Sequence, residues 1–200
     1  MPPPSEGREY NPLDYENLAR NCVEELMRRG PWALDEVVAR AFEGAGVYAL
    51  FYAGDFPAYW GERPPEGARP IYVGKAVPSG ARKGQASDPG SPLWGRLREH
   101  HGSIAAAHST LRTADFLCRY LAVTPIWITM AERLLIESFQ PVWNVCIEGF
   151  GNHDPGSGRH RGEVPWWDAL HPGRPWAARL RQTRSAADAL TRLDQERGRR

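Results

Sequence analysis

The alternation of apolar and polar positions predicts three short strands in the middle of the chain. Along Val47–Ala53 both faces of the strand are mainly apolar, a pattern that is typical of a central strand covered on both sides. Ile71–Gly74 and Asp115–Val123 are the other two predicted strands.

Apolar residues at helical spacing predict five helices around these strands. The first follows Asn11-Pro12 and stops at Gly30, and the last is arginine-rich and begins near Ser185. The other three cover Trp32–Phe42, Ser91–Ala107 and Thr129–Gln140, the last ending before Pro141. Strands and helices in this order predict an α+β fold.

Glycine and proline divide the chain into three regions. Residues 1–45 form a helical extension, and residues 46–148 form a core with two long Gly- and Pro-rich insertions at 54–69 and 77–91. Residues 149–200 form an irregular tract that ends in the basic helix.

Composition narrows the classes of protein that the chain can be. A hydrophobic content of 42% is sufficient for a packed core. No apolar run approaches the ~20 residues of a membrane span, and the first ten residues do not have the pattern of a signal peptide. The three cysteines are far apart and predict neither a disulfide framework nor a metal knuckle. We therefore expect a cytoplasmic protein.

The charge is distributed unevenly along the chain. Residues 159–200 hold ten arginines and five acidic residues, a net charge of +5, whereas the whole chain carries +1. Such a tail can follow a phosphate backbone, although a solvated surface helix explains it equally well.

Four places carry polar groups that a packed domain does not require. Tyr48 and Tyr72 would share one face of the sheet if their strands are neighbours, although tyrosine is also a good structural strand residue. Arg96 and His100 stand four residues apart on one helix and therefore share a face.

The third and fourth places are Glu132 and Asn144. Thr129 and Glu132 have the spacing of a capping box, but a carboxylate there could also bind a divalent cation. Asn144 follows Pro141, where asparagine is commonly a turn residue.

Taken in order, these residues resemble the GIY-YIG nuclease family. The namesake triplets are "GVY", Gly46–Tyr48, and "YVG", Tyr72–Gly74, with valine in place of isoleucine in both. The resemblance covers residues 46–144, about half of the chain. Its long insertions and N-terminal helices are similar to the type II restriction endonucleases of this family, and most of all to a subgroup that cuts a GC-rich six-base palindrome.

The resemblance implies a small three-stranded antiparallel sheet flanked by helices. It also implies hydrolysis of double-stranded DNA by an in-line water, with Mg²⁺ or another divalent cation and 5′-phosphate products. A phenol acting as the base needs its pKa lowered by nearby positive charge. The implied catalytic residues are Tyr48 as base, Tyr72 to position water or phosphate, Arg96 to stabilise phosphoryl charge, His100 as a possible proton relay, Glu132 as metal ligand, Asn144 as support, and Lys75, which follows "YVG".

The resemblance further implies DNA contacts and partners. The N-terminal extension and the insertions would embrace the DNA, with Arg82 and Lys83 in the second insertion. Arg159, Arg161 and Arg174 could reach guanines. A palindrome cutter with one catalytic set per chain needs a homodimer, and restriction requires a companion DNA methyltransferase.

Other functions remain open at this point. Asn152, His153 and His160 could belong to a His-metal nuclease finger. A repair or homing endonuclease could use the same core, and a non-catalytic DNA-binding protein could retain the fold. A Mg²⁺-dependent plasmid-cutting assay separates the last of these from the nucleases.

Overall fold

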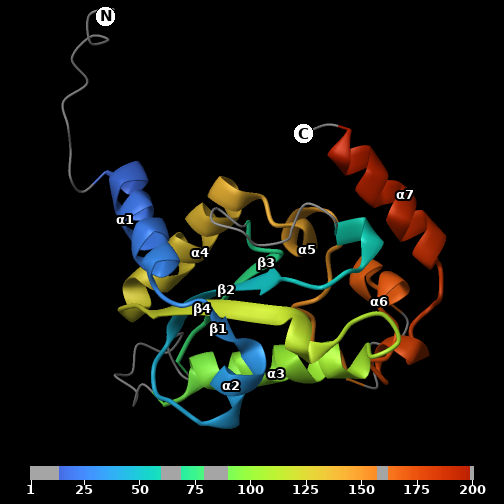
Figure 1. Ribbon diagram of the computed structural model, residues 1–200, viewed down its shortest axis with the longest axis horizontal. Helices are drawn as coiled ribbons and strands as arrows, with labels where there is room; N and C mark the ends of the chain where they lie inside the picture. The colour runs from blue at the N-terminus through green and yellow to red at the C-terminus, as the bar shows by residue number, and fades with distance from the viewer. Residues whose placement is uncertain (1–13, 60–68, 79–89, 157–161, 199–200) are drawn as a thin grey trace, which may run out of the picture.

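The computed structural model describes residues 14–59, 69–78, 90–156 and 162–198. These residues form an α+β fold in which an antiparallel sheet lies between helices (Figure 1). The strands are β1 (Trp32–Ala33), β2 (Gly46–Tyr52), β3 (Tyr72–Ala76) and β4 (Phe116–Ala122). The helices are α1 (Tyr15–Arg28), α2 (Leu34–Ala39), α3 (Pro92–Ala106), α4 (Pro125–Phe139), α5 (Val142–Val145), α6 (Trp166–Leu170) and α7 (Ala186–Arg197). Among these elements no helix is long and apolar enough to cross a membrane.

The sheet has four strands in the order β1-β4-β2-β3, so the prediction of three strands is corrected. The added strand β1 pairs two residues with β4, Trp32 with Cys118 and Ala33 with Leu117. We predicted these residues as the start of a helix, but Trp32 instead packs its ring 5.2 Å from that of Tyr120. Two residues are too few to produce a strand pattern in the sequence.

Strand β2 is central, as its apolar pattern predicted. It pairs with β4 on one side and β3 on the other, and all seven of its residues are buried. One face, which includes Tyr48 and Leu50, packs with residues of α3 and of the C-terminal tract. The other face, which includes Val47 and Phe51, packs against α4 and α1 (Figure 1).

Helix α4 begins earlier than predicted. Thr124 occupies the N-cap position and Pro125 the first turn, which is the position that proline favours in helices. Thr129 is therefore inside the helix, and the predicted capping box of Thr129 and Glu132 is wrong. Glu132 lies in the middle of α4, where no N-cap requires its carboxylate.

The C-terminal tract packs onto the same core as the sheet. Trp167 of α6 and Leu193 of α7 belong to the hydrophobic cluster that contains Tyr48. The basic helix begins at Ser185, as predicted, and Ser185 forms a capping box with Asp188. The predicted cap at Asn11-Pro12 lies outside the described residues.

A buried polar network ties this tract to the rest of the fold. His171 Nε2 lies 2.5 Å from the Tyr59 hydroxyl, and His171 Nδ1 lies 2.8 Å from Thr110 Oγ1. The indole of Trp143 donates to the same Tyr59 oxygen at 2.9 Å. Burial lowers the pKa of His171 from 6.5 to about 3, so the folded protein holds this imidazole in its neutral form.

This network predicts an acid-sensitive fold. A folded-state pKa below the unfolded value of 6.5 means that the contribution of His171 is complete above pH 6.5 and is lost as pH falls toward 3. When the pH falls from 7.5 to 5, His171 should therefore lower the free energy of unfolding by about 2 kcal/mol. Urea denaturation measures the free energy of unfolding at both pH values. Between them it should fall by about 2 kcal/mol less in His171→Gln than in the wild-type protein. Exposed His108→Gln is the control, and an unchanged dependence in His171→Gln would contradict the assignment.

Candidate active site

The two tyrosines of the triplets lie together on one face of the sheet. Tyr48 pairs in register with Gly74, and Tyr72 pairs with Leu50 of the same strand as Tyr48. Because side chains of neighbouring strands in register share a face, both rings point to the side that α3 covers. Their ring centroids are 6.3 Å apart.

Both triplets require glycine because neighbouring atoms lie where a side chain would begin. A Cβ atom on Gly74 would lie 2.3 Å from the Tyr48 hydroxyl. A Cβ atom on Gly46 would lie 2.0 Å from the backbone oxygen of Leu121 in β4. Gly74 therefore makes room for the phenol, and Gly46 makes room for the neighbouring strand.

His100 lies between the tyrosines and is almost completely buried, with 1% of its surface exposed. Its Nε2 is 2.6 Å from the Tyr48 hydroxyl, and its ring meets Tyr72 edge-on at 5.2 Å. Burial, followed by the charge of Arg96, holds the pKa of His100 well below its ordinary value. A neutral His100 with Nε2 unprotonated accepts the Tyr48 proton in this hydrogen bond.

The pKa of Tyr48 is shifted in the direction opposite to our expectation. Burial raises it well above the usual value, and the nearby Tyr72 adds to this, whereas Arg96 opposes it only in part. Lys75 pairs with Val47, one residue along from Tyr48, so its side chain points to the other face. In the protein without DNA, Tyr48 is therefore a neutral phenol.

Arg96 stands one helical turn before His100, and 17% of its side chain is exposed. It donates to the Gly151 carbonyl at 2.6 Å and to Glu99 at 2.7 Å. The imidazole of His153 lies 2.6 Å from the same guanidinium. Tyr48, Tyr72 and His100 together form the tyrosine cluster. The guanidinium lies at the surface edge of this cluster, with its charge close to both phenols.

Glu132 extends from α4 toward the end of β3. Its Oε2 lies 2.6 Å from the Lys75 ammonium, and 21% of the Glu132 side chain is exposed. The carboxylate raises the pKa of both Tyr48 and Tyr72, although it is not the main cause in either case. Glu132 is therefore within electrostatic reach of the tyrosine cluster and already holds one cationic group.

Asn144 acts as a short extension of the sheet. Its Oδ1 accepts from the Val73 amide at 2.8 Å, and its Nδ2 donates to the Val73 carbonyl at 2.9 Å. Because β3 is an edge strand, the amide takes the place of a neighbouring strand. It is more than a turn residue, since it holds the "YVG" strand in place.

Sequence reasoning missed a segment that covers the site. Phe150 stacks on His100 at 4.5 Å with an interplanar angle of 19°, and Gly151 contacts Arg96. We noted His153 only as part of a possible metal finger. Among the described residues no group of three or more His, Cys, Asp or Glu side chains could hold a metal ion, and His160 lies outside them.

The prediction that Arg174 reads DNA bases is wrong. Arg174 is 4% exposed and is bound to Asp168 and to backbone carbonyls, so it has no access to a DNA groove. The other predicted DNA contacts lie outside the described residues: Arg82, Lys83, Arg159 and Arg161.

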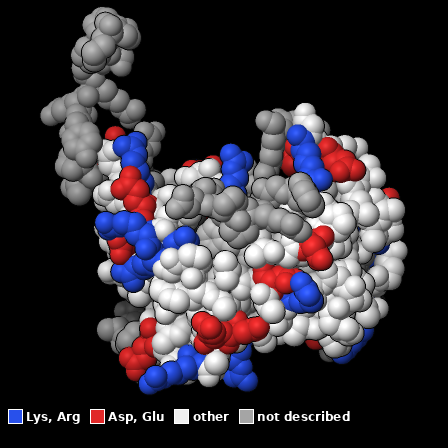
Figure 2. Space-filling model, in the orientation of Figure 1, with Lys and Arg blue, Asp and Glu red and all other residues white. Residues whose placement is uncertain are grey.

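The basic tail is partly neutralised. Arg181 and Arg184 both lie near Glu163, at 3.7 and 3.2 Å, and Arg197 lies 4.0 Å from Asp194. Figure 2 shows basic and acidic side chains interspersed on one face of the molecule. The net charge of the tail in sequence is therefore not a measure of the positive charge that it presents.

The role of Asn144 generates a prediction that does not depend on catalysis. In Asn144→Asp the carboxylate cannot donate to the Val73 carbonyl and is left facing it. Loss of a part-buried hydrogen bond of this kind should lower the free energy of unfolding by about 1–3 kcal/mol. Urea denaturation at pH 7.5 measures it, with exposed Asn152→Asp as the control. Equal stability of the two variants would contradict the strand-like role.

Comparison with known proteins agrees with this geometry. The model of the Eco29kI GIY-YIG domain, a family associated with restriction endonucleases, matches residues 40–196. No curated protein matches the chain. The matched residues make up well over half of the chain and contain both tyrosine strands, α3, α4 and the segment that covers the site. The chain therefore belongs to the Eco29kI GIY-YIG domain family of nucleases.

Proposed function

We propose that the protein is a type II restriction endonuclease that hydrolyses double-stranded DNA at a palindromic, GC-rich six-base site. It would use Mg²⁺ and leave 5′-phosphate ends. The observation that carries this proposal is the position of Arg96, a guanidinium that remains partly exposed at the edge of the buried pair of Tyr48 and His100, whose polar atoms are 2.6 Å apart. A plasmid-cutting assay with and without Mg²⁺ is the first test.

A neutral Tyr48 can still remove a proton from water if it loses its own proton in the same step. The water proton would pass to the Tyr48 oxygen, and the Tyr48 proton would pass to His100 Nε2 along the existing hydrogen bond. The phenolate then never accumulates, so the raised pKa of Tyr48 does not block this step. Burial and the charge of Arg96 hold the pKa of His100 low, and the negative charge of a phosphate bound at Arg96 would favour the protonated imidazole. Tyr72 would position the attacking water or the phosphate.

Arg96 is suited to stabilise charge that develops on the phosphoryl oxygens. Its guanidinium is held in a fixed orientation by Gly151 and Glu99, and a preorganised cation needs little reorganisation during the reaction. In a complex with DNA, phosphate oxygens would compete with Glu99 and His153 for its donors.

Glu132 could serve as the protein ligand of a Mg²⁺ ion that is also bound by a DNA phosphate. Mg²⁺ keeps several waters and takes one or two carboxylates together with substrate oxygens, so a lone carboxylate is sufficient. The Lys75 ammonium lies 2.6 Å from Glu132 Oε2, so the ion would have to displace it or share the carboxylate with it. When bound, the ion would supply Lewis acidity to the leaving 3′ oxygen.

Glu132→Gln should separate a metal role from a structural one. Glutamine has similar helix propensity, and Glu132 is not at a cap. The lost ion pair with Lys75 is partly exposed, so the free energy of unfolding should fall by no more than about 1 kcal/mol. Cleavage should fall by about 10³-fold or more, because a Lewis acid supplies several kcal/mol to such a reaction. DNA binding should persist or tighten, since a negative charge near the phosphate has been removed.

The matched control is Glu137→Gln in the same helix. Glu137 is exposed and pairs only locally with Arg133, at 2.7 Å, so the variant should cleave at the wild-type rate. Single-turnover cleavage and urea denaturation are measured on both variants. A Glu132→Gln protein that cuts at a near-normal rate would refute the metal assignment.

We further propose that the enzyme acts as a homodimer. The described residues contain one set of Tyr48, Tyr72, His100 and Arg96, and a palindrome offers two equivalent strands related by a two-fold axis. Sedimentation velocity with a duplex that carries the mapped site should give two chains per duplex. One chain per duplex during cleavage of both strands would overturn this proposal. A restriction role would also require a methyltransferase that protects the same site.

A further inference from the structure

The segment Gly149–Asn152 forms the wall of the active site opposite the sheet. Phe150 stacks on His100, and its ring also meets Tyr72 edge-on at 4.9 Å. A Cβ atom on Gly151 would lie 2.5 Å from the Tyr72 hydroxyl. The segment thus contacts both Tyr72 and His100, and through the Gly151 carbonyl it also holds Arg96.

This segment lies outside every helix and strand, so another group must hold it in place. That group is Arg174, which donates to the carbonyls of three of its residues. The distances are 2.8 Å to Gly149, 2.9 Å to Phe150 and 3.1 Å to Asn152.

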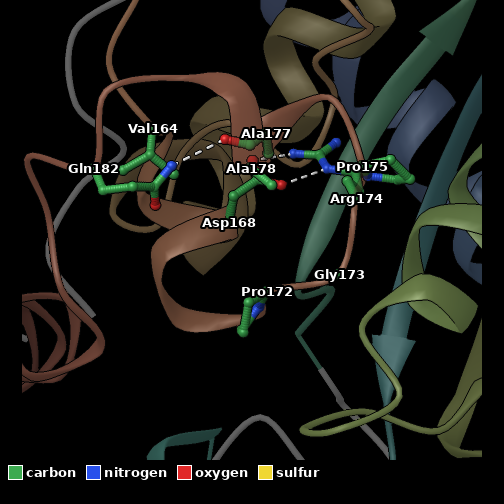
Figure 3. Close-up of a pocket in the computed structure, with 9 residues that line it drawn as sticks. All are labelled: Val164, Asp168, Pro172, Gly173, Arg174, Pro175, Ala177, Ala178 and Gln182. Atoms are coloured by element: carbon green, nitrogen blue, oxygen red, sulfur yellow. Dashed lines mark hydrogen bonds and ion pairs between the residues drawn. The ribbon is translucent and has the colours of Figure 1, made fainter.

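Arg174 is itself held by Asp168. Nε donates to Oδ1 at 2.6 Å and Nη2 to Oδ2 at 2.5 Å, and Figure 3 shows the two side chains pointing toward each other. With the three carbonyls, these contacts use all five N–H donors of the guanidinium. Trp167 and Trp176 each lie 4.6 Å from its central carbon.

The energetics favour a geometric role for this buried pair. The side chains of Arg174 and Asp168 are 4% and 1% exposed, and desolvation raises the pKa of Asp168 against the effect of its partner. Buried ion pairs add little stability compared with well-packed apolar residues of similar volume. Here the pair contributes geometry, because the planar guanidinium of Arg174 donates to three carbonyls in fixed directions.

We propose that Arg174, oriented by Asp168, is a positioning residue that holds Gly149–Asn152 against His100, Tyr72 and Arg96. Release of this segment removes the stacking partner of His100 and the carbonyl that orients Arg96. The catalytic groups then lose their relative positions, while DNA contacts made outside this segment and Arg96 are retained, because Arg174 is buried.

Arg174→Lys tests this role, and its activity arm rests on the proposed nuclease function. Lysine keeps the charge but has three donors in place of five. At saturating enzyme and Mg²⁺, the single-turnover cleavage rate of a plasmid fragment carrying the mapped site should fall about 10²-fold, as expected for a displacement near 1 Å. The Kd for the same fragment, measured in Ca²⁺, should change far less than the rate, because Arg96 is one of many DNA contacts.

A second readout does not require activity. Amide hydrogen exchange should accelerate in peptides that cover residues 147–153 of Arg174→Lys and stay unchanged in α7. If wild-type protein cuts no DNA, the proposed function fails while the exchange data still test the clamp. Unchanged exchange at 147–153 overturns the clamp, and faster exchange with a wild-type cleavage rate overturns the positioning role.

Two further variants guard against a general folding defect. Arg192→Lys alters another part-buried arginine of the tract, which donates to the Cys146 carbonyl at 2.8 Å and contacts none of residues 149–152. It should keep both the wild-type rate and exchange. In Gly151→Ala the added Cβ atom would lie 2.5 Å from the Tyr72 hydroxyl, so either the segment or Tyr72 must shift; both changes alter the contact between them without touching Arg174, and the cleavage rate should fall much more than the affinity for DNA. A wild-type rate in Gly151→Ala would also overturn the proposal.

Discussion

The active site depends on a phenol that is buried in the central strand of the sheet. Tyr48 can occupy that position because Gly74 on the next strand has no side chain, and because its hydroxyl has a hydrogen-bond partner in His100 Nε2 at 2.6 Å. A buried hydroxyl without a partner would destabilise the fold. The same hydrogen bond therefore satisfies the core and prepares a proton path. The buried position of Tyr48 therefore depends on both Gly74 and His100.

The site is assembled from segments that are far apart in the sequence. Strands β2 and β3 supply the tyrosines, α3 supplies Arg96 and His100, and the C-terminal tract supplies the wall. Glu132 approaches from α4, which lies on the opposite face of the sheet, and reaches Lys75 near the end of β3. Phe150, Trp167 and Leu170 of this tract pack into the core of the nuclease unit.

Local sequence patterns predicted the helices and strands that have strong periodicity. They failed where contacts between distant residues determine the structure. The three long strands and α3 follow from alternation and helical spacing, but β1 is too short to leave a pattern. The cap of α4 was misplaced because Thr129 and Glu132 have capping-box spacing, whereas Pro125 starts the helix. The sequence predicts Arg174 as a base-reading residue, and this is wrong because charge in a sequence carries no information about burial.

A second tyrosine–histidine pair in the fold shows what makes the first one a candidate for catalysis. Tyr59 and His171 are joined at 2.5 Å and are as deeply buried as Tyr48 and His100. Burial alone accounts for the lowered pKa of His171, whereas the charge of Arg96 also acts on His100. The hydrogen bond is thus common to both pairs and cannot define the site. The distinguishing feature is Arg96, a cation at the edge of the cluster that can bring a phosphate next to the buried proton path.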